Sequence, residues 1–163
     1  MVDAHHFDLE RFTAAQSQTF TSALNELRAG AKHSHWMWFI FPQLRELGRS
    51  AMAQLYGIES LRAAQAYLNH PVLGPRLILS TESVLAVKGR TVHQIFGSPD
   101  DLKFCSSMTL FHRAAGDGEN VFRQALDKRS LAFLGCAALD QYITWHMDLA
   151  TLSSKGQGSF GVQ

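Results

Sequence analysis

The sequence predicts a mainly helical protein, folded as a single compact helical domain with little or no strand. Apolar residues recur at helical spacing along most of the chain. Hydroxyl or acidic side chains suited to helix starts precede these segments, and glycines suited to helix ends follow them. Alternating runs of β-branched residues, which would indicate strands, are almost absent. We therefore expect more than about half of the chain to be helical, against about one third in an average globular protein.

Four helices are expected in the first half of the chain, apart from an aromatic segment treated below. Asp8 can cap the first helix, and Gly30 suits the left-handed residue that closes it. Ser50 and Ser60 can each cap a further helix, and a proline after His70 starts a new segment. The expected helices cover residues 8–30, 50–57, 60–70 and, starting at 71 or 74, up to 88.

Three more helices are expected in the second half. A short one covers residues 91–96. The next has Ser98 at the N-cap, Pro99 at the first helical position and Asp100 and Asp101 where the helix dipole favours negative charge, and it runs to Ala115. A last helix covers 119–129, and residues 131–152 are apolar but ambiguous. We expect one domain over 1–152 and a disordered Ser/Gly/Gln-rich tail over 153–163.

Residues 36–41, Trp-Met-Trp-Phe-Ile-Phe, form an aromatic block that is apolar on both sides in any conformation. We expect it to be buried, since large aromatic side chains dominate protein cores. Trp36 and Trp38 can also stack on a planar ligand, as aromatic walls do in binding pockets. For Trp38 we expect the core role.

The composition of the chain argues against several functional classes, among them nucleic-acid-binding and membrane proteins. Apolar residues make up 46% of the chain, charged residues only 18%, and the net charge is +1. This balance does not indicate a nucleic-acid binder, which usually shows a basic stripe. The longest apolar run, residues 36–41, is too short to cross a membrane, and the N-terminus shows no signal-peptide core. Cys105 and Cys136 fit buried thiols rather than a disulfide framework. We therefore expect a cytoplasmic protein with no nucleic-acid or membrane partner.

Several polar residues are candidates for binding a small molecule. His35 and Gln43 bracket the aromatic block, and a histidine can change its protonation near neutral pH. A metal shared by His33 and His35 would need a third ligand, and no motif supplies one. No Walker loop, GxGxxG or GxSxG motif appears, so the sequence indicates no bound cofactor or metal and no hydrolase serine.

The second group of candidates lies on the helix that starts near residue 100. Ser106, Ser107 and Thr109 can bind phosphate or sugar, or can hydrogen-bond back to their own helix. Lys103 and Ser106 share a helical face and suit a phosphate group. Asp101, on another face, is interpreted mainly as a capping residue that can also line a pocket.

Five stretches, among them SHWMWFIFPQ and SPDDLKFCSSMTLF, resemble the bacterial domain-of-unknown-function 1810 family, over residues 7–126. The resemblance implies a small, mainly helical protein with no established activity. The segment RSLAFLGCAALDQYITWHM departs from the family pattern. The resemblance also implies which residues belong to family motifs: His35, Trp36, Trp38, Pro42, Gln43, Asp101, Lys103, Ser106, Ser107 and Thr109.

Two functions remain open. In the first, the polar residues of both motifs converge with Trp36 on a nucleotide-like ligand of the ADP-ribose or NAD type, which the protein binds or processes. The general layout is distantly similar to that of the NAD/ADP-ribose-associated (NADAR) proteins. In the second, the aromatic block is an exposed patch of a non-enzymatic interaction module. The sequence does not decide whether the chain is an enzyme, nor its oligomeric state.

Overall fold

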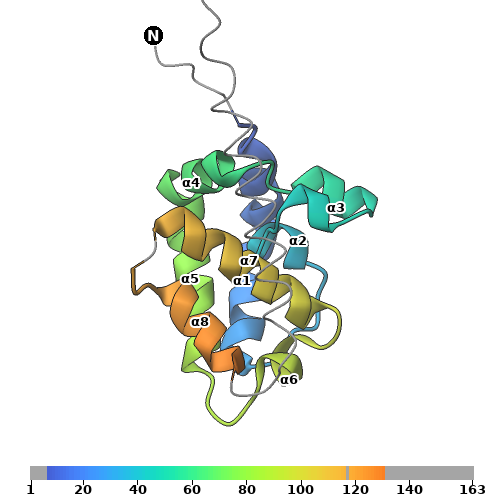
Figure 1. Ribbon diagram of the computed structural model, residues 1–163. Coiled ribbons are helices and arrows are strands. Elements are labelled where there is room, and N and C mark those ends of the chain that lie inside the picture. Colours follow the sequence, from blue (N-terminus) through green and yellow to red (C-terminus); the bar gives the residue numbers. More distant parts are fainter. Residues whose placement is uncertain (1–6, 117, 131–163) are drawn as a thin grey trace, which may run out of the picture.

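Helices account for about 70% of the residues described by a computed structural model, which covers 7–116 and 118–130 (Figure 1). No strand occurs among these residues. They contain one isolated parallel β-bridge, between Leu44 and Ile58. The predicted helical fold class is therefore confirmed. The helices are α1 (Glu10–Ala29), α2 (Met37–Ile40), the short 3-10 helix η1 (Arg45–Leu47), α3 (Ala51–Tyr56), α4 (Leu61–Asn69), α5 (Leu73–Ala86), α6 (Val92–Phe96), α7 (Asp100–Ala115) and α8 (Val121–Ser130).

Most of the predicted helix ends are confirmed. The Ser50 and Ser60 hydroxyls accept hydrogen bonds of 3.1 Å from Ala53 N and Ala63 N, and so cap α3 and α4. Gly30 closes α1 in the left-handed conformation, with φ of 71°. The segment 131–152, with Cys136, and the tail 153–163 lie outside the described residues.

Two predicted N-caps are wrong. α1 has Leu9, not Asp8, at its N-cap, and no side chain caps it. α7 has Pro99 at its N-cap instead of Ser98. The first N–H groups of a helix need acceptors from outside the regular helical bonds, and here backbone carbonyls supply some of them in place of a side chain. Leu9 O accepts from Phe12 N, and Gly97 O accepts from Asp101 N.

The aromatic block forms one helical turn, α2, rather than a long helix. Pro42 follows it directly and disfavours helical conformation at Phe41, whose backbone adopts φ of −123° and ψ of 71°. Within the block only Trp38 is half-buried, and the other five residues are buried. The expectation of burial on both sides is confirmed for the block, but the expectation that Trp38 is a core residue is wrong.

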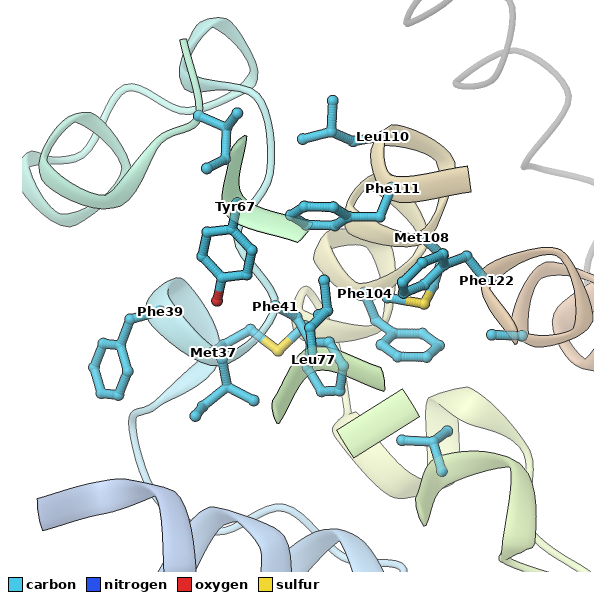
Figure 2. Close-up of a cluster of buried hydrophobic side chains, with 14 of the residues drawn as sticks. Met37, Phe39, Phe41, Tyr67, Leu77, Phe104, Met108, Leu110, Phe111 and Phe122 are labelled. Carbon is cyan, nitrogen blue, oxygen red and sulfur yellow. The ribbon is translucent and has the colours of Figure 1, made fainter. Parts of the chain in front are cut away.

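α7 is the central helix of the fold and crosses the front of the molecule in Figure 1. It contacts α2, α4, α6 and α8, and residues 104–111 are all buried. Figure 2 shows its aromatic side chains packed against the other elements. Phe104 meets Phe41 of the aromatic block at a ring-centroid distance of 4.9 Å, and Phe111 meets Tyr67 of α4 at 5.3 Å. This packing fixes the first turn of α7 beside the aromatic block.

Candidate functional site

Three charged side chains meet where the first turn of α7 faces the loop after α1. The Asp100 carboxylate accepts from the Lys32 ammonium through Oδ2, at 2.7 Å, and from the Lys103 ammonium through Oδ1, at 2.8 Å. We call Lys32, Asp100 and Lys103 the two-lysine cluster. Both lysines are mostly buried, with side-chain exposures of 9% and 19%. A lysine that is this strongly buried normally requires a partner, and here one carboxylate serves two of them.

Each lysine also lies over an indole ring of the aromatic block. The Lys103 ammonium is 3.7 Å from the centroid of the Trp38 ring, and the Lys32 ammonium is 5.1 Å from that of Trp36. Ammonium groups are attracted to the electron-rich face of an indole. The aromatic block therefore helps to hold the two lysines close together.

The cluster carries a net charge of +1, since two ammonium groups share one carboxylate. Partial burial would raise the pKa of Asp100, but its bonds to Lys103 and Lys32 outweigh this effect and lower it, so the carboxylate is ionised at neutral pH. The N-terminus of α7, a helix of 16 residues, adds positive partial charge next to Asp100. The arrangement therefore suits an anion near Lys103.

Glu26 of α1 holds the loop that carries Lys32. Its carboxylate accepts hydrogen bonds from His33 N at 2.7 Å, from Ser34 N at 3.0 Å and from the Ser34 hydroxyl. It also accepts from the Trp36 indole N–H at 2.9 Å. Burial alone would raise the pKa of Glu26, but these four bonds lower it to about 2. Glu26 is thus an ionised anchor that fixes the approach to the aromatic block.

A small slot lies beside the cluster, between α2, α3 and α7. Its volume is about 10 Å³, enough for one water-sized group. The polar side chains that line it are Gln43, Tyr56 and Lys103, and Trp38 forms part of its wall.

A histidine–carboxylate pair lies next to the cluster. His93 Nδ1 of α6 is 2.8 Å from Asp101 Oδ2 of α7. The His93 side chain is 66% exposed, whereas that of Asp101 is only 15% exposed. The carboxylate is therefore held by the protein while much of the imidazole faces solvent.

A wider depression of about 570 Å³ lies elsewhere, between α4, α5, α7 and α8. It contains apolar and amide side chains but no charged one, so it lacks an anchor for an anion. It is lined by Gln65, Leu68, Asn69, Ile78, Ala114, Ala115, Asn120, Val121 and Phe122.

Comparison with known proteins identifies the family of the chain. The family model described as "Protein of unknown function (DUF1810)" matches residues 6–133. The chain belongs to the DUF1810 family. A similar solved structure is the crystal structure of the conserved hypothetical protein Rv1873 from Mycobacterium tuberculosis, with 57% sequence identity and a TM-score of 0.73. That match covers 75% of this chain and 86% of the mycobacterial chain. No curated protein matches the chain.

In this DUF1810 protein, the structure brings together only part of the predicted site. Gln43 and Lys103 line the same slot. Trp36 is fully buried and supports Lys32, while His35 is exposed and does not line the slot. Asp101 is not the N-cap residue of α7, but its carboxylate accepts from Leu102 N in the first turn, at 2.8 Å, and pairs with His93. The predicted convergence of His35 with Lys103 in one pocket is not observed.

The three hydroxyl side chains of α7 point into the protein. Ser106 and Thr109 donate to the carbonyls of Leu102 and Cys105, each at 3.0 Å. Ser107 is fully buried and has no hydrogen-bond partner among the described residues. Lys103 and Ser106 therefore do not form the expected phosphate pair, because burial of the whole 104–111 run turns Ser106 away from solvent.

Sequence reasoning missed Lys32 and Glu26 and treated Asp100 only as part of a helix start. A signal for Lys32 was present, because it directly precedes the HSHW motif at the start of the aromatic block. Nothing in the spacing indicated that Lys32 would meet Asp100, since the two residues are distant in the chain. Their contact also depends on a hydrogen bond of 2.8 Å from Lys32 N to Ile95 O, which attaches the loop after α1 to α6.

Proposed function

We propose that this protein binds a phosphorylated, nucleotide-like small molecule of the ADP-ribose or NAD type at the two-lysine cluster. The observation that carries the proposal is the shared carboxylate: Asp100 neutralises only one of two ammonium groups, and the positive end of a helix lies beside them. A phosphate group supplies the missing negative charge. Among the predicted residues, Lys103 would contact the phosphate and Gln43 the neighbouring part of the ligand.

The size of the slot restricts how such a ligand lies. A slot of about 10 Å³ admits one oxygen-sized group, so the rest of the ligand would lie across its mouth. Lys103 now covers the ring of Trp38 at 3.7 Å. A cation–π contact contributes about 0.5–2 kcal/mol, depending on how far it is desolvated, and a hydrogen bond between charged groups contributes about 1.5–3 kcal/mol. A phosphate can therefore draw Lys103 off Trp38 and leave this half-buried indole to stack on a planar base.

The alternative function, an interaction module that uses the aromatic block, has less support. Hot-spot patches present large aromatic side chains to the partner. Five of the six residues in the block are buried, which leaves mainly Trp38 for such a contact.

The proposal is tested by thermal-shift and calorimetric titration of the full-length protein with ADP-ribose, NAD, AMP and inorganic phosphate. A ligand at 100 times its Kd adds about 2.7 kcal/mol to the free energy of unfolding, which corresponds to a Tm increase of about 5–10 °C. The inorganic phosphate arm shows whether the phosphate alone is sufficient.

Two substitutions in the cluster have opposite expected effects. Lys103→Met removes one positive charge and should weaken binding at least tenfold. Asp100→Asn removes the competing carboxylate and should strengthen it. A general loss of structure would weaken binding in both variants. The matched control is Lys88→Met, since Lys88 is exposed and takes no part in the ion pairs of the cluster. No shift with any of the four compounds would refute the proposal and favour the interaction module.

A further inference from the structure

The slot beside the two-lysine cluster has one polar side chain from α3, that of Tyr56. The Tyr56 ring is half-buried and packs against two core phenylalanines, Phe12 at a ring-centroid distance of 5.9 Å and Phe39 at 5.3 Å. Its hydroxyl makes no hydrogen bond with any of the described residues. Tyr56 therefore brings a fixed ring and an available hydroxyl group to the slot.

The isolated β-bridge holds together the two chain segments that border the slot on this side. Ile58 N donates to Gln43 O at 2.9 Å. Gly57, which also lines the slot, allows the close approach of the two segments, because a Cβ there would lie only 2.5 Å from Arg45 Cα. The bridge thus fixes Tyr56, directly before Gly57, and Gln43 on neighbouring segments at the same slot.

The small size of the slot brings Tyr56 and Lys103 to the same atom. A volume of about 10 Å³ holds one oxygen-sized group, which then lies between the walls contributed by α2, α3 and α7. Several of the side chains around it are apolar, among them Met37, Phe41 and Ala53. The Lys103 ammonium can only donate hydrogen bonds, and the Tyr56 hydroxyl can donate one. Two donors that face one oxygen favour an oxygen that only accepts, as the unprotonated oxygen of an anion does.

We propose that the slot is an oxyanion pocket in which Tyr56 donates a hydrogen bond to the same phosphate oxygen that Lys103 binds. This role of Tyr56 rests on the proposed function, which supplies the bound phosphate. The oxygen that enters the slot is a non-bridging oxygen of a phosphate ester or diphosphate, which carries negative charge. A sugar hydroxyl is uncharged and gains less from Lys103, since hydrogen bonds between charged groups are about twice as strong as neutral ones. Tyr56 is thus a specificity-determining residue that selects phosphate compounds over nucleosides.

The test is calorimetric titration of the full-length protein with inorganic phosphate, AMP, ADP-ribose and adenosine. Tyr56→Phe keeps the ring that packs against Phe12 and Phe39 and removes only the hydroxyl. It should weaken binding of the three phosphate compounds about 10- to 100-fold, the range for one hydrogen bond to a charged group. Adenosine should bind the wild type more weakly than AMP does. The matched control is Tyr67→Phe, since the Tyr67 hydroxyl bonds to Gln16 and does not line the slot, and this variant should bind as the wild type does.

The outcomes separate the role of Tyr56 from the proposed function. Unchanged affinity for the phosphate compounds in Tyr56→Phe would overturn the role of Tyr56 and leave binding at the two-lysine cluster intact. An equal loss in Tyr67→Phe would also overturn it, because the effect would then not depend on the slot. Adenosine bound as tightly as AMP would show that no phosphate oxygen occupies the slot. Absence of wild-type binding to every phosphate compound would refute the proposed function, and the role of Tyr56 with it.

Discussion

The Glu26 carboxylate shows how one residue organises the candidate site. It receives two backbone N–H groups, a hydroxyl and the indole of Trp36, all from the four residues 33–36. A carboxylate with four donors is stabilised in its ionised form, and it in turn holds the loop in which Lys32 is placed.

Stability is expected to depend on pH through Glu26. Its folded-state pKa of about 2 lies below the ordinary value of 4.5, so the ionised form stabilises the folded state. This contribution is fully present above about pH 4.5 and is lost as the pH falls toward 2. Glu26→Gln should lower the free energy of unfolding at pH 7 by about 2 kcal/mol, since an amide accepts fewer of these bonds.

Urea denaturation of the wild type and Glu26→Gln at pH 7, 4.5 and 2.5 provides the measurement. The difference between the two proteins should shrink as the pH falls. An equal difference at all three pH values would contradict the assigned role of Glu26.

The two tryptophans of the aromatic block should respond differently to truncation. Trp36 is fully buried and hydrogen-bonded, so Trp36→Ala should cost about 3–5 kcal/mol. Trp38 is half-buried beneath Lys103, and Trp38→Ala should cost about 1–2 kcal/mol. Chemical denaturation measures both values, and a cost for Trp38 equal to that for Trp36 would show that Trp38 is a core residue after all.

The Ser107→Ala substitution tests whether the buried hydroxyl of Ser107 has a structural or a ligand-binding role. Its hydroxyl is buried without a partner among the described residues, a state that costs about 1–3 kcal/mol. Ser107→Ala should therefore leave stability unchanged or raise it by about 1 kcal/mol. The same variant, titrated with ADP-ribose, should bind as the wild type does, and weakened binding would instead place Ser107 in the ligand site.

At the scale of elements, the C-terminal end of α5 is capped by a side chain from another helix, α8. The Lys128 ammonium of α8 donates to the carbonyls of Val84, Leu85 and Val87, at 2.9, 3.3 and 2.6 Å. These groups lie at the end of α5, where a helix presents unpaired carbonyls and negative partial charge. The predicted helix continued to Lys88, two residues beyond the observed end at Ala86.

Removing this cap should destabilise the packing of α5 against α8. We expect Lys128→Met to lower the free energy of unfolding by about 1–2 kcal/mol, the range for a partly buried cation at a helix C-terminus. The control is Arg123→Ala in the same helix, which breaks an exposed ion pair with Asp127 and should cost less than about 0.5 kcal/mol. Equal losses in the two variants, measured by thermal unfolding, would show that the Lys128 contacts contribute nothing specific.

At the scale of the whole molecule, a buried polar network joins four helices. Gln16 of α1 donates to Phe39 O of α2 at 2.7 Å and to the hydroxyl of Tyr67 in α4 at 3.1 Å. Arg76 of α5 donates to Gln16 Oε1 at 3.4 Å. Gln16 is 1% exposed, so its loss would leave several buried groups without a partner.

A double-mutant cycle should reveal this coupling. Gln16→Leu should cost about 2–3 kcal/mol, because Phe39 O and the Tyr67 hydroxyl lose their donor. Tyr67→Phe removes one of these orphaned groups, so the double variant should be more stable than the sum of the single effects by about 1 kcal/mol. Additive effects in urea denaturation would exclude the network as a stabilising unit.

None of the described helices is long and apolar enough to cross a membrane. The same helical periodicity that predicted the longer helices is consistent with this, since α1, α4 and α8 have exposed polar positions on the face away from the core. Large apolar side chains, such as those of Phe104 and Phe111, turn inward.

Local chemistry by itself determined the helical fold class, the serine caps of α3 and α4, the glycine that ends α1 and the burial of most of the aromatic block. Each of these depends on residues within one or two turns of one another, and such short-range preferences are present in the sequence itself. The candidate site was predictable only in part, as Gln43 and Lys103 belong to motifs on either side of the slot.

Only the tertiary structure decided which polar side chains meet. Ser106 and Thr109 have the same residue types as many phosphate ligands, yet the central position of α7 buries them. The contact of Lys32 with Asp100 requires the loop after α1 to attach to α6 beside the first turn of α7. Contacts of this kind depend on how separate helices pack around a shared core, and no spacing along one segment of the chain specifies that packing.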